Sequence, residues 1–142
     1  MEDSKTKDLT KNPVPPIIFF DGICKLCNST VDYILKKDTK RVFQFAPLQG
    51  KTAEKLLGKR AKKKTSVILY QDGVIYEKSD AIIQILPRLG MLEYQVSLTL
   101  KKIPKQGRDR VYDFIAKLRY VIFGKRDQCR LPSSEEADRF LD

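Results

Sequence analysis

The sequence predicts an α/β fold, with a βαβ-α-ββ-α core around a mixed four-stranded sheet and a C-terminal helical extension. Two observations support this prediction. Apolar runs at residues 17–20 and 42–45 flank an amphipathic stretch at 24–37, and a helical connection of this length implies parallel strands joined by a right-handed crossover. Asp72-Gly73 lies between two further apolar runs and indicates a hairpin, because both residues tolerate the positive φ angles of its turn.

The βαβ unit comes first. Its opening run, Ile17–Phe20, is apolar on both faces, as in a buried parallel strand, and Asp21-Gly22 ends it. The next stretch, 24–37, has one apolar face, which is typical of a helix packed on a core. That face consists of Cys27, Val31, Ile34 and Leu35. The second strand is expected at 42–45, closed by a proline.

The rest of the core is a helix, a hairpin and another helix. A weakly amphipathic helix is expected at about 48–58, and the hairpin strands at 66–70 and 74–76. The third helix begins at Ser79 or Asp80, either of which can cap its free backbone amides. Its inner face is expected to hold Ala81, Ile82, Ile85 and Leu86.

The C-terminal extension is predicted to contain two helices. They cover 92–103 and 108–123, with a break at Pro104–Gly107 between them, and Gly124 is suited to end the second. The apolar residues of this second helix lie along one stripe. They are Val111, Phe114, Ile115, Leu118 and Ile122.

The chain has the length of one domain, and both of its ends are polar. We therefore expect a disordered N-terminal tail, a single domain and a C-terminal tail, at 1–15, 16–132 and 133–142. Within the domain, the core, the helical extension and a segment that contains Cys129 are expected at 16–90, 91–124 and 125–132.

The net charge of +10 raises the question of a nucleic-acid partner. Lysine is spread through the chain, however, and its one dense run, Lys59–Lys64, follows the end of a predicted helix, where cations are favoured. No aromatic residues are interleaved with this run. Nucleic acid is therefore not the expected partner, although a basic surface can steer an acidic one. No apolar run reaches membrane-spanning length, so we expect a cytoplasmic protein without a membrane partner. The sequence does not indicate whether the chain forms oligomers.

The composition narrows the chemistry to thiols, carboxylates, lysine and tyrosine. The chain has no histidine, which excludes histidine bases and histidine metal ligands, and it has three cysteines, too few for a disulfide scaffold. Two of them form a CxxC motif, Cys24-Lys25-Leu26-Cys27, on the turn from strand to helix. Free amides at a helix start stabilise a thiolate, and Lys25 should add to this, so we expect a lowered pKa for Cys24.

Cys27 lies on the inward stripe of the same helix, so it is shielded but close enough to attack a mixed disulfide formed on Cys24. This interpretation requires two adjacent sulfurs at the helix start. Sulfurs that point apart, or that are buried away from solvent in the middle of an element, would exclude it. Asp21 either accepts hydrogen bonds from the helix-start amides or takes the proton of Cys27 during resolution. A zinc site would need a carboxylate or a second chain beside Cys129, so no metal is expected.

The segment Phe20–Cys27 resembles the signature of the DCC family of predicted thiol–disulfide oxidoreductases. Ser79-Asp80-Ala81 resembles the Ser-Asp-Ala block of that family, and Arg119–Cys129 resembles its C-terminal Arg-Tyr, Phe-Gly and Cys block. The resemblance implies a thioredoxin-like fold with an added helical part. Phe19–Gly22 also resembles the start of a haloacid-dehalogenase-like phosphatase, but the second aspartate of that motif is replaced by Ile23.

Candidates for substrate contacts are Ser66, Ser79, Asp80 and Lys25, and Cys129 is a candidate accessory thiol. Thioredoxins place a cis-proline opposite the active cysteine, and this chain has Ser66 there, whose hydroxyl can bond a substrate. The segment Lys78–Ile82 looks like the glutathione-transferase segment whose serine binds a carboxylate of glutathione. Ser79 is therefore a candidate for binding glutathione or a similar thiol, although the neighbouring Asp80 would repel the carboxylate. Cys129 either packs as a small apolar residue or acts as an accessory thiol.

The sequence thus predicts a thiol–disulfide oxidoreductase that uses Cys24 and Cys27 on a thiol or disulfide substrate, either a protein or a small molecule, without another cofactor. The alternative is a redox-inert thioredoxin-fold module whose basic surface binds an acidic partner. The substrate, the reductant and the direction of exchange are not specified by the sequence.

Overall fold

Four strands form one mixed sheet in the order β2-β1-β3-β4. The computed structural model describes residues 15–62, 67–124 and 137–141. The strands are β1 (Ile17–Phe20), β2 (Gln44–Pro47), β3 (Val67–Gln71) and β4 (Val74–Glu77). Strand β1 runs parallel to β2 and antiparallel to β3, and β3 pairs antiparallel with β4. The α/β class and the mixed four-stranded sheet are therefore confirmed.

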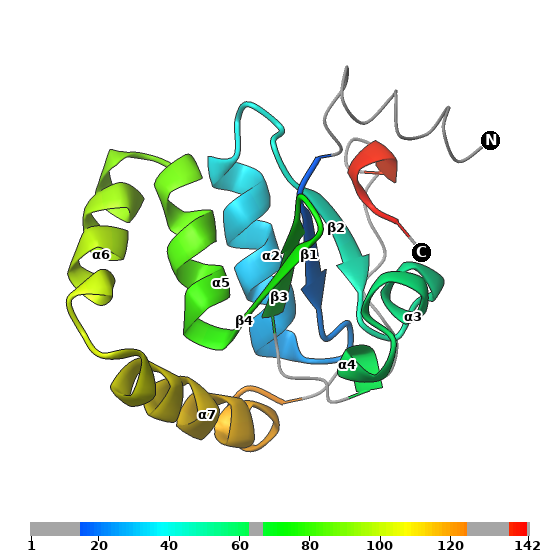
Figure 1. Cartoon of the computed structure of the whole chain (residues 1–142). Helices are drawn as coiled ribbons and strands as arrows, with labels where there is room; N and C mark the ends of the chain where they lie inside the picture. The colour runs from blue at the N-terminus through cyan, green and yellow to red at the C-terminus, as the bar shows by residue number, and fades with distance from the viewer. Residues whose placement is uncertain (1–14, 63–66, 125–136, 142) are drawn as a thin grey trace.

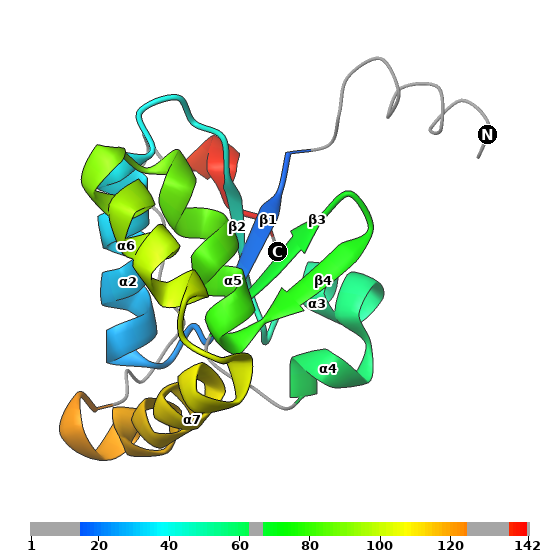
Figure 2. The ribbon, with the colours of Figure 1, turned by 60° about the vertical axis from the view of Figure 1, so that its left-hand side comes forward.

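Helices cover both faces of this sheet (Figures 1 and 2). The helices are α2 (Lys25–Lys37), α3 (Lys51–Leu57), α4 (Lys59–Lys62), α5 (Lys78–Ile85), α6 (Met91–Lys101) and α7 (Lys105–Ile122), with 3-10 turns η1 (Leu86–Arg88) and η2 (Ala137–Arg139). Helices α2 and α5 pack on one face, and α3 and α4 lie on the other. Helix α6 lies outside α5, and α7 crosses the ends of α2 and α5.

Alternate side chains of β1 supply the two cores, because successive residues of a strand point to opposite faces. Ile18 and Phe20 pack with the apolar faces of α2 and α5, and this larger core includes Cys24 and Cys27. Ile17 and Phe19 pack with α3 and α4 on the other face. The cysteine pair therefore lies in the wall of the larger core, directly after β1.

Strand β2 starts two residues later than the sequence predicts. The backbone amides of Val42 and Phe43 donate to the buried carboxylate of Asp38 at 3.0 and 2.9 Å, so they do not join the sheet. Pro47 can be the last residue of β2 because this strand lies at the edge of the sheet, where a missing backbone N–H donor is tolerated. The hairpin is confirmed, with φ angles of 52° at Asp72 and 79° at Gly73.

The last described residues, 137–141, pack against the domain. Phe140 forms a bridge beside Phe45 of β2, and the Leu141 amide donates to the Phe45 carbonyl at 2.7 Å. The ring of Phe140 lies 6.2 Å from that of Phe20 and 5.4 Å from that of Phe45, centroid to centroid. Arg139 pairs with buried Asp38. The predicted N-terminal tail, except residue 15, lies outside the described residues.

Helix α7 turns its polar side, not its apolar stripe, towards the domain. Within the stripe, Val111, Phe114, Ile115 and Ile122 are exposed. The side that faces the domain carries Arg119, which is buried, and Tyr112, whose hydroxyl accepts the Val67 backbone amide at 3.0 Å.

Candidate functional site

Cys24 is itself the N-cap of α2. Its backbone is extended, with φ of −85° and ψ of 121°, and its Sγ accepts the backbone amide of Cys27 at 3.3 Å. The sulfur thus takes the position in which a serine or aspartate oxygen usually satisfies a free helix-start amide. The two sulfurs are neighbours, because the Cys27 thiol also hydrogen-bonds to Cys24. The adjacency and the helix-start position that the sequence analysis required are both present.

This environment separates the acidities of the two thiols. The pKa of Cys24 is lowered from 9.0 to about 7, mainly by the contact with the Cys27 thiol. The Cys27 backbone amide and Arg119 lower it further, whereas burial and the Asp21 charge act in the opposite direction. The same contact keeps Cys27 protonated and, together with burial, raises its pKa. Cys24 is therefore suited to attack as a thiolate, and Cys27 is held as a thiol.

Both thiols are nevertheless buried, with 0% of Cys24 and 2% of Cys27 exposed. The end of α7 helps to cover the two thiols. The backbone amide of Lys25 donates to the Gly124 carbonyl at 3.2 Å, and Tyr120 packs against the core that contains both cysteines. A molecule in solvent can therefore reach the Cys24 sulfur only after a local opening.

Asp21 lies at the centre of a buried hydrogen-bond network beside the thiols. Its carboxylate has no exposed surface and accepts bonds from Ile23 N at 3.2 Å, Gln49 Nε2 at 2.7 Å, Arg119 Nη2 at 3.3 Å and the Tyr120 hydroxyl. Gln49 also accepts the Gly22 amide at 3.0 Å, which ties the turn before α2 to the end of β2. A buried carboxylate needs such partners to stay ionised. Burial and the bond to Asp21 raise the pKa of Tyr120 to about 12, so its hydroxyl remains a donor.

Arg119, Tyr120 and Gln49 are site residues that the sequence reasoning did not assign. In the sequence, Arg119 and Tyr120 stand out only as part of the block that resembles the DCC family, and no pattern singles out Gln49. The one available clue was their place on α7: Tyr112, Ala116 and Tyr120 recur every four residues opposite the apolar stripe, a spacing that places them on one helix face. Arg119 also supplies the cationic contribution to the Cys24 pKa that the sequence analysis gave to Lys25, whose side chain is exposed and lies against Gly124.

Ser79 and Asp80 form a second polar cluster, held together by α7. The N-cap of α5 is Glu77 rather than Ser79 or Asp80, which corrects the predicted cap. The Ser79 hydroxyl donates to Asp109 and accepts from Arg108 at 3.1 Å. Asp80 pairs with Lys105 at 2.8 Å and with Arg108 at 3.3 Å, and these cations lower its pKa against burial.

The remaining candidates do not add to the described site. In the described part of the chain, no hydrogen bond or ion pair joins Ser79 or Asp80 to Cys24 or Cys27. Ser66 and Cys129 lie outside the described residues. Within the described ranges, no group of three or more candidate metal ligands occurs. None of the described helices has the length and apolarity needed to cross a membrane.

The strand order and the cysteine pair at the start of the helix after β1 are those of a thioredoxin-like protein with a dithiol site. The chain belongs to the DCC1-like thiol-disulfide oxidoreductase family, whose model matches residues 18–125. It is 37% identical to the uncharacterized protein YuxK of Bacillus subtilis, covering 94% of this chain and 99% of that protein. It is 34% identical to the chloroplastic DCC family protein At1g52590 of Arabidopsis thaliana, covering 82% of this chain and 69% of that protein. No solved structure matches significantly.

Proposed function

We propose that the chain exchanges electrons between its Cys24–Cys27 pair and a thiol or disulfide substrate. The observation that supports this most is the position of Cys24: its sulfur caps α2 by accepting the Cys27 amide at 3.3 Å, and its pKa is lowered to about 7. About half of such a thiol is thiolate at neutral pH, compared with a few per cent of an ordinary cysteine.

In the reducing direction, the Cys24 thiolate attacks one sulfur of a substrate disulfide. A Cys24–substrate disulfide forms, and the other half of the substrate leaves as a thiolate. This step removes the negative charge that Cys27 was bonding, which is the main cause of the raised Cys27 pKa. Cys27 then loses its proton more easily, with Asp21 as the acceptor.

The Cys27 thiolate attacks the Cys24 sulfur and expels the second substrate thiolate. The chain is left with a Cys24–Cys27 disulfide, and two electrons have passed to the substrate. An external dithiol reverses these steps and restores the reduced pair. The direction of net flow depends on the reduction potentials of the partners.

The test follows both steps by mass spectrometry with glutathione disulfide as the probe. The reduced protein should lose two hydrogens as Cys24 and Cys27 join, without retaining glutathione. The Cys27→Ser variant should stop at a glutathionyl adduct on Cys24, because no resolving thiol remains. The Cys24→Ser variant should form neither product at a comparable rate.

The Cys129→Ser variant is the matched control, and it should behave as the unaltered chain if the third cysteine is not needed for exchange. A Cys27→Ser protein that gains no adduct at Cys24, while the denatured chain does, would contradict the proposal. That result would favour the redox-inert binding module.

A further inference from the structure

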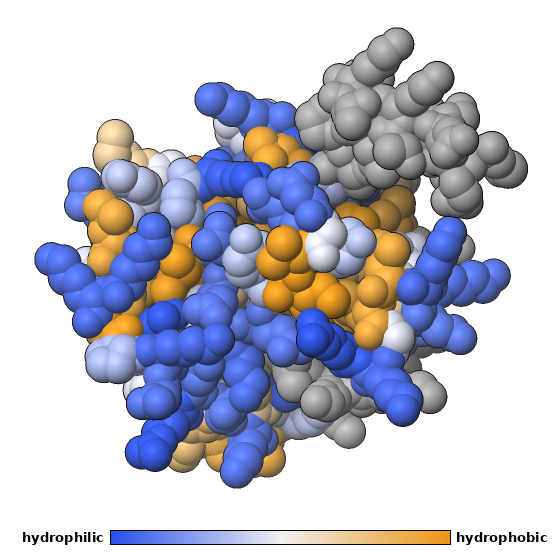
Figure 3. Space-filling view, viewed as in Figure 1, coloured by the Kyte–Doolittle hydropathy of each residue, from blue (hydrophilic) through white to orange (hydrophobic). Residues whose placement is uncertain are grey.

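The outer side of α7 carries an apolar surface that the domain does not cover. We define the α7 stripe by its exposed members, Val111, Phe114, Ile115, Val121 and Ile122. Phe114 is 64% exposed, Ile122 63% and Val121 82%. Exposed apolar residues are ordinary when scattered, but a continuous row on one helix face marks an interaction surface. In Figure 3, apolar surface emerges among hydrophilic side chains along the lower edge of the molecule, where α7 lies.

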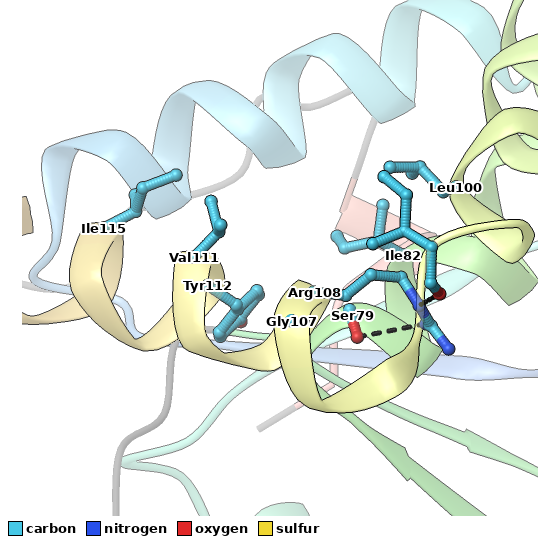
Figure 4. Close-up of a pocket in the computed structure, with 9 residues that line it drawn as sticks. Ser79, Ile82, Leu100, Gly107, Arg108, Val111, Tyr112 and Ile115 are labelled. Atoms are coloured by element: carbon cyan, nitrogen blue, oxygen red, sulfur yellow. Dashed lines mark hydrogen bonds between the residues drawn. The ribbon is translucent and has the colours of Figure 1, made fainter.

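One border of the stripe continues into an apolar cavity of about 240 Å³ between α5, α6 and α7. Val111 and Ile115 project from α7 into this space, and Ile82 and Leu100 line it from the other side (Figure 4). The polar groups at its edge are already paired, since Arg108 donates to Ser79. The cavity therefore extends the apolar surface and offers no free polar group to a ligand.

The other border of the stripe is cationic. With 3.6 residues per turn, Arg110 and Lys117 lie next to Phe114 and Val121, on the side away from the cavity. Both cations are exposed, and neither forms an ion pair with a residue in the described ranges. The acids of α7 already have partners: Asp109 bonds Ser79, and Asp113, which lies one turn from Lys117 on the same side of the helix, pairs with Lys78 at 3.0 Å.

We propose that the α7 stripe binds the surface of an anionic lipid bilayer, with its apolar residues in the headgroup boundary and with Arg110 and Lys117 on lipid phosphates. An apolar row with a phenylalanine, a cationic border and a low overall hydrophobicity is the pattern of a helix that lies in a membrane interface. No membrane partner is expected from the sequence, because no segment is long enough to span a bilayer. A helix that lies on the membrane surface needs no such length.

The same charges disfavour a second copy of the chain as the occupant. In a two-fold contact between antiparallel α7 helices, the Arg110 and Lys117 borders of the two copies would face each other and repel. An acidic protein would also satisfy the cations, and the vesicle experiment distinguishes this occupant, because a chain that uses the stripe only for an acidic protein does not bind mixed vesicles.

Co-sedimentation with vesicles tests the proposal. The full chain should bind vesicles of phosphatidylcholine mixed with phosphatidylglycerol, and bind phosphatidylcholine alone weakly. Arg110→Gln with Lys117→Gln should lower binding about 30-fold, because each cation near an anionic surface contributes about 1 kcal/mol. Phe114→Ser with Ile122→Ser should lower binding on the order of 10-fold or more.

The matched controls remove the same groups elsewhere. Lys51→Gln with Lys55→Gln removes two exposed cations from α3, on the opposite face of the sheet, and Val74→Ser removes an exposed apolar residue from β4. Both should bind mixed vesicles within a few-fold of the unaltered chain. No binding to mixed vesicles, or an equal loss in the α3 control, would overturn the proposal. A dimer in sedimentation analysis that Phe114→Ser dissociates would also overturn it, by assigning the stripe to a second copy.

Discussion

Replacing Arg119 with methionine tests whether this buried guanidinium helps to set the acidity of the Cys24 thiol. Arg119 contributes less to the lowered pKa of about 7 than the two hydrogen bonds from Cys27 do, and Asp21 opposes all three. Its removal takes away one favourable contribution and leaves the Asp21 charge unbalanced. We expect the pKa to rise by about half a unit to one unit, which lowers the thiolate fraction at pH 7 from about one half to between about a quarter and a tenth.

The assay is the initial rate of Cys24 alkylation by iodoacetamide as a function of pH, measured on the Cys24 peptide by mass spectrometry. The rate rises with pH through the pKa and levels off above it, because only the thiolate reacts. The Arg119→Met curve should therefore move to higher pH. The Asp21→Asn curve should move to lower pH, since the Asp21 charge raises the Cys24 pKa, and the double variant should lie between the two.

The matched control is Arg139→Met, which breaks another buried pair of arginine and aspartate, that with Asp38. Arg139 is not among the groups that act on the Cys24 pKa, so this variant should lose stability without moving the pH curve. A folded Arg119→Met protein with an unmoved curve, or an equal shift in Arg139→Met, would refute an electrostatic role for Arg119.

Three further predictions concern stability and the second polar cluster. Arg139→Met should lower the free energy of unfolding by about 3–5 kcal/mol in urea titrations, because it leaves the Asp38 carboxylate buried without its cation. Gly73→Ala should cost about 1–2 kcal/mol, since φ is 79° there, whereas Gly107→Ala inside α7 should be neutral or stabilising in the same titration. Asp109→Ala should strengthen calorimetric binding of glutathione to the oxidised chain, because it removes the carboxylate that already occupies Ser79; weaker binding in this variant would contradict that assignment.

Local patterns predicted the part of the fold that depends on neighbouring residues. The β1 strand, the α2 helix and the hairpin each follow from a pattern within about fifteen residues, and all three are confirmed. The CxxC motif belongs to this group, because its placement on a helix start follows from the residues directly before and after it. The lowered pKa of Cys24 was accordingly predictable in direction.

Element boundaries were wrong where a side chain competes with the backbone. The Asp38 carboxylate binds the backbone amides of Val42 and Phe43, so these residues do not pair in β2. The strand propensity of the two residues gives no sign of this competing hydrogen bond. Ser79 was predicted as a cap because serine favours that position, but Asp109, thirty residues away, bonds both its amide and its hydroxyl. Local propensity is overridden in both places by a carboxylate whose position depends on tertiary structure.

The orientation of α7 was not available from its own sequence, and the reason lies in Asp21. An amphipathic helix is expected to bury its apolar side, yet α7 buries Arg119 and exposes Phe114. A carboxylate without exposed surface, placed beside two thiols, needs charged and hydroxyl donors more than the core needs another apolar contact, since an unpaired buried charge costs several kcal/mol. Arg119 and Tyr120 meet that need from 98 and 99 residues away. The dithiol site is therefore completed by the helical extension, and the stripe left uncovered on α7 follows from the same demand.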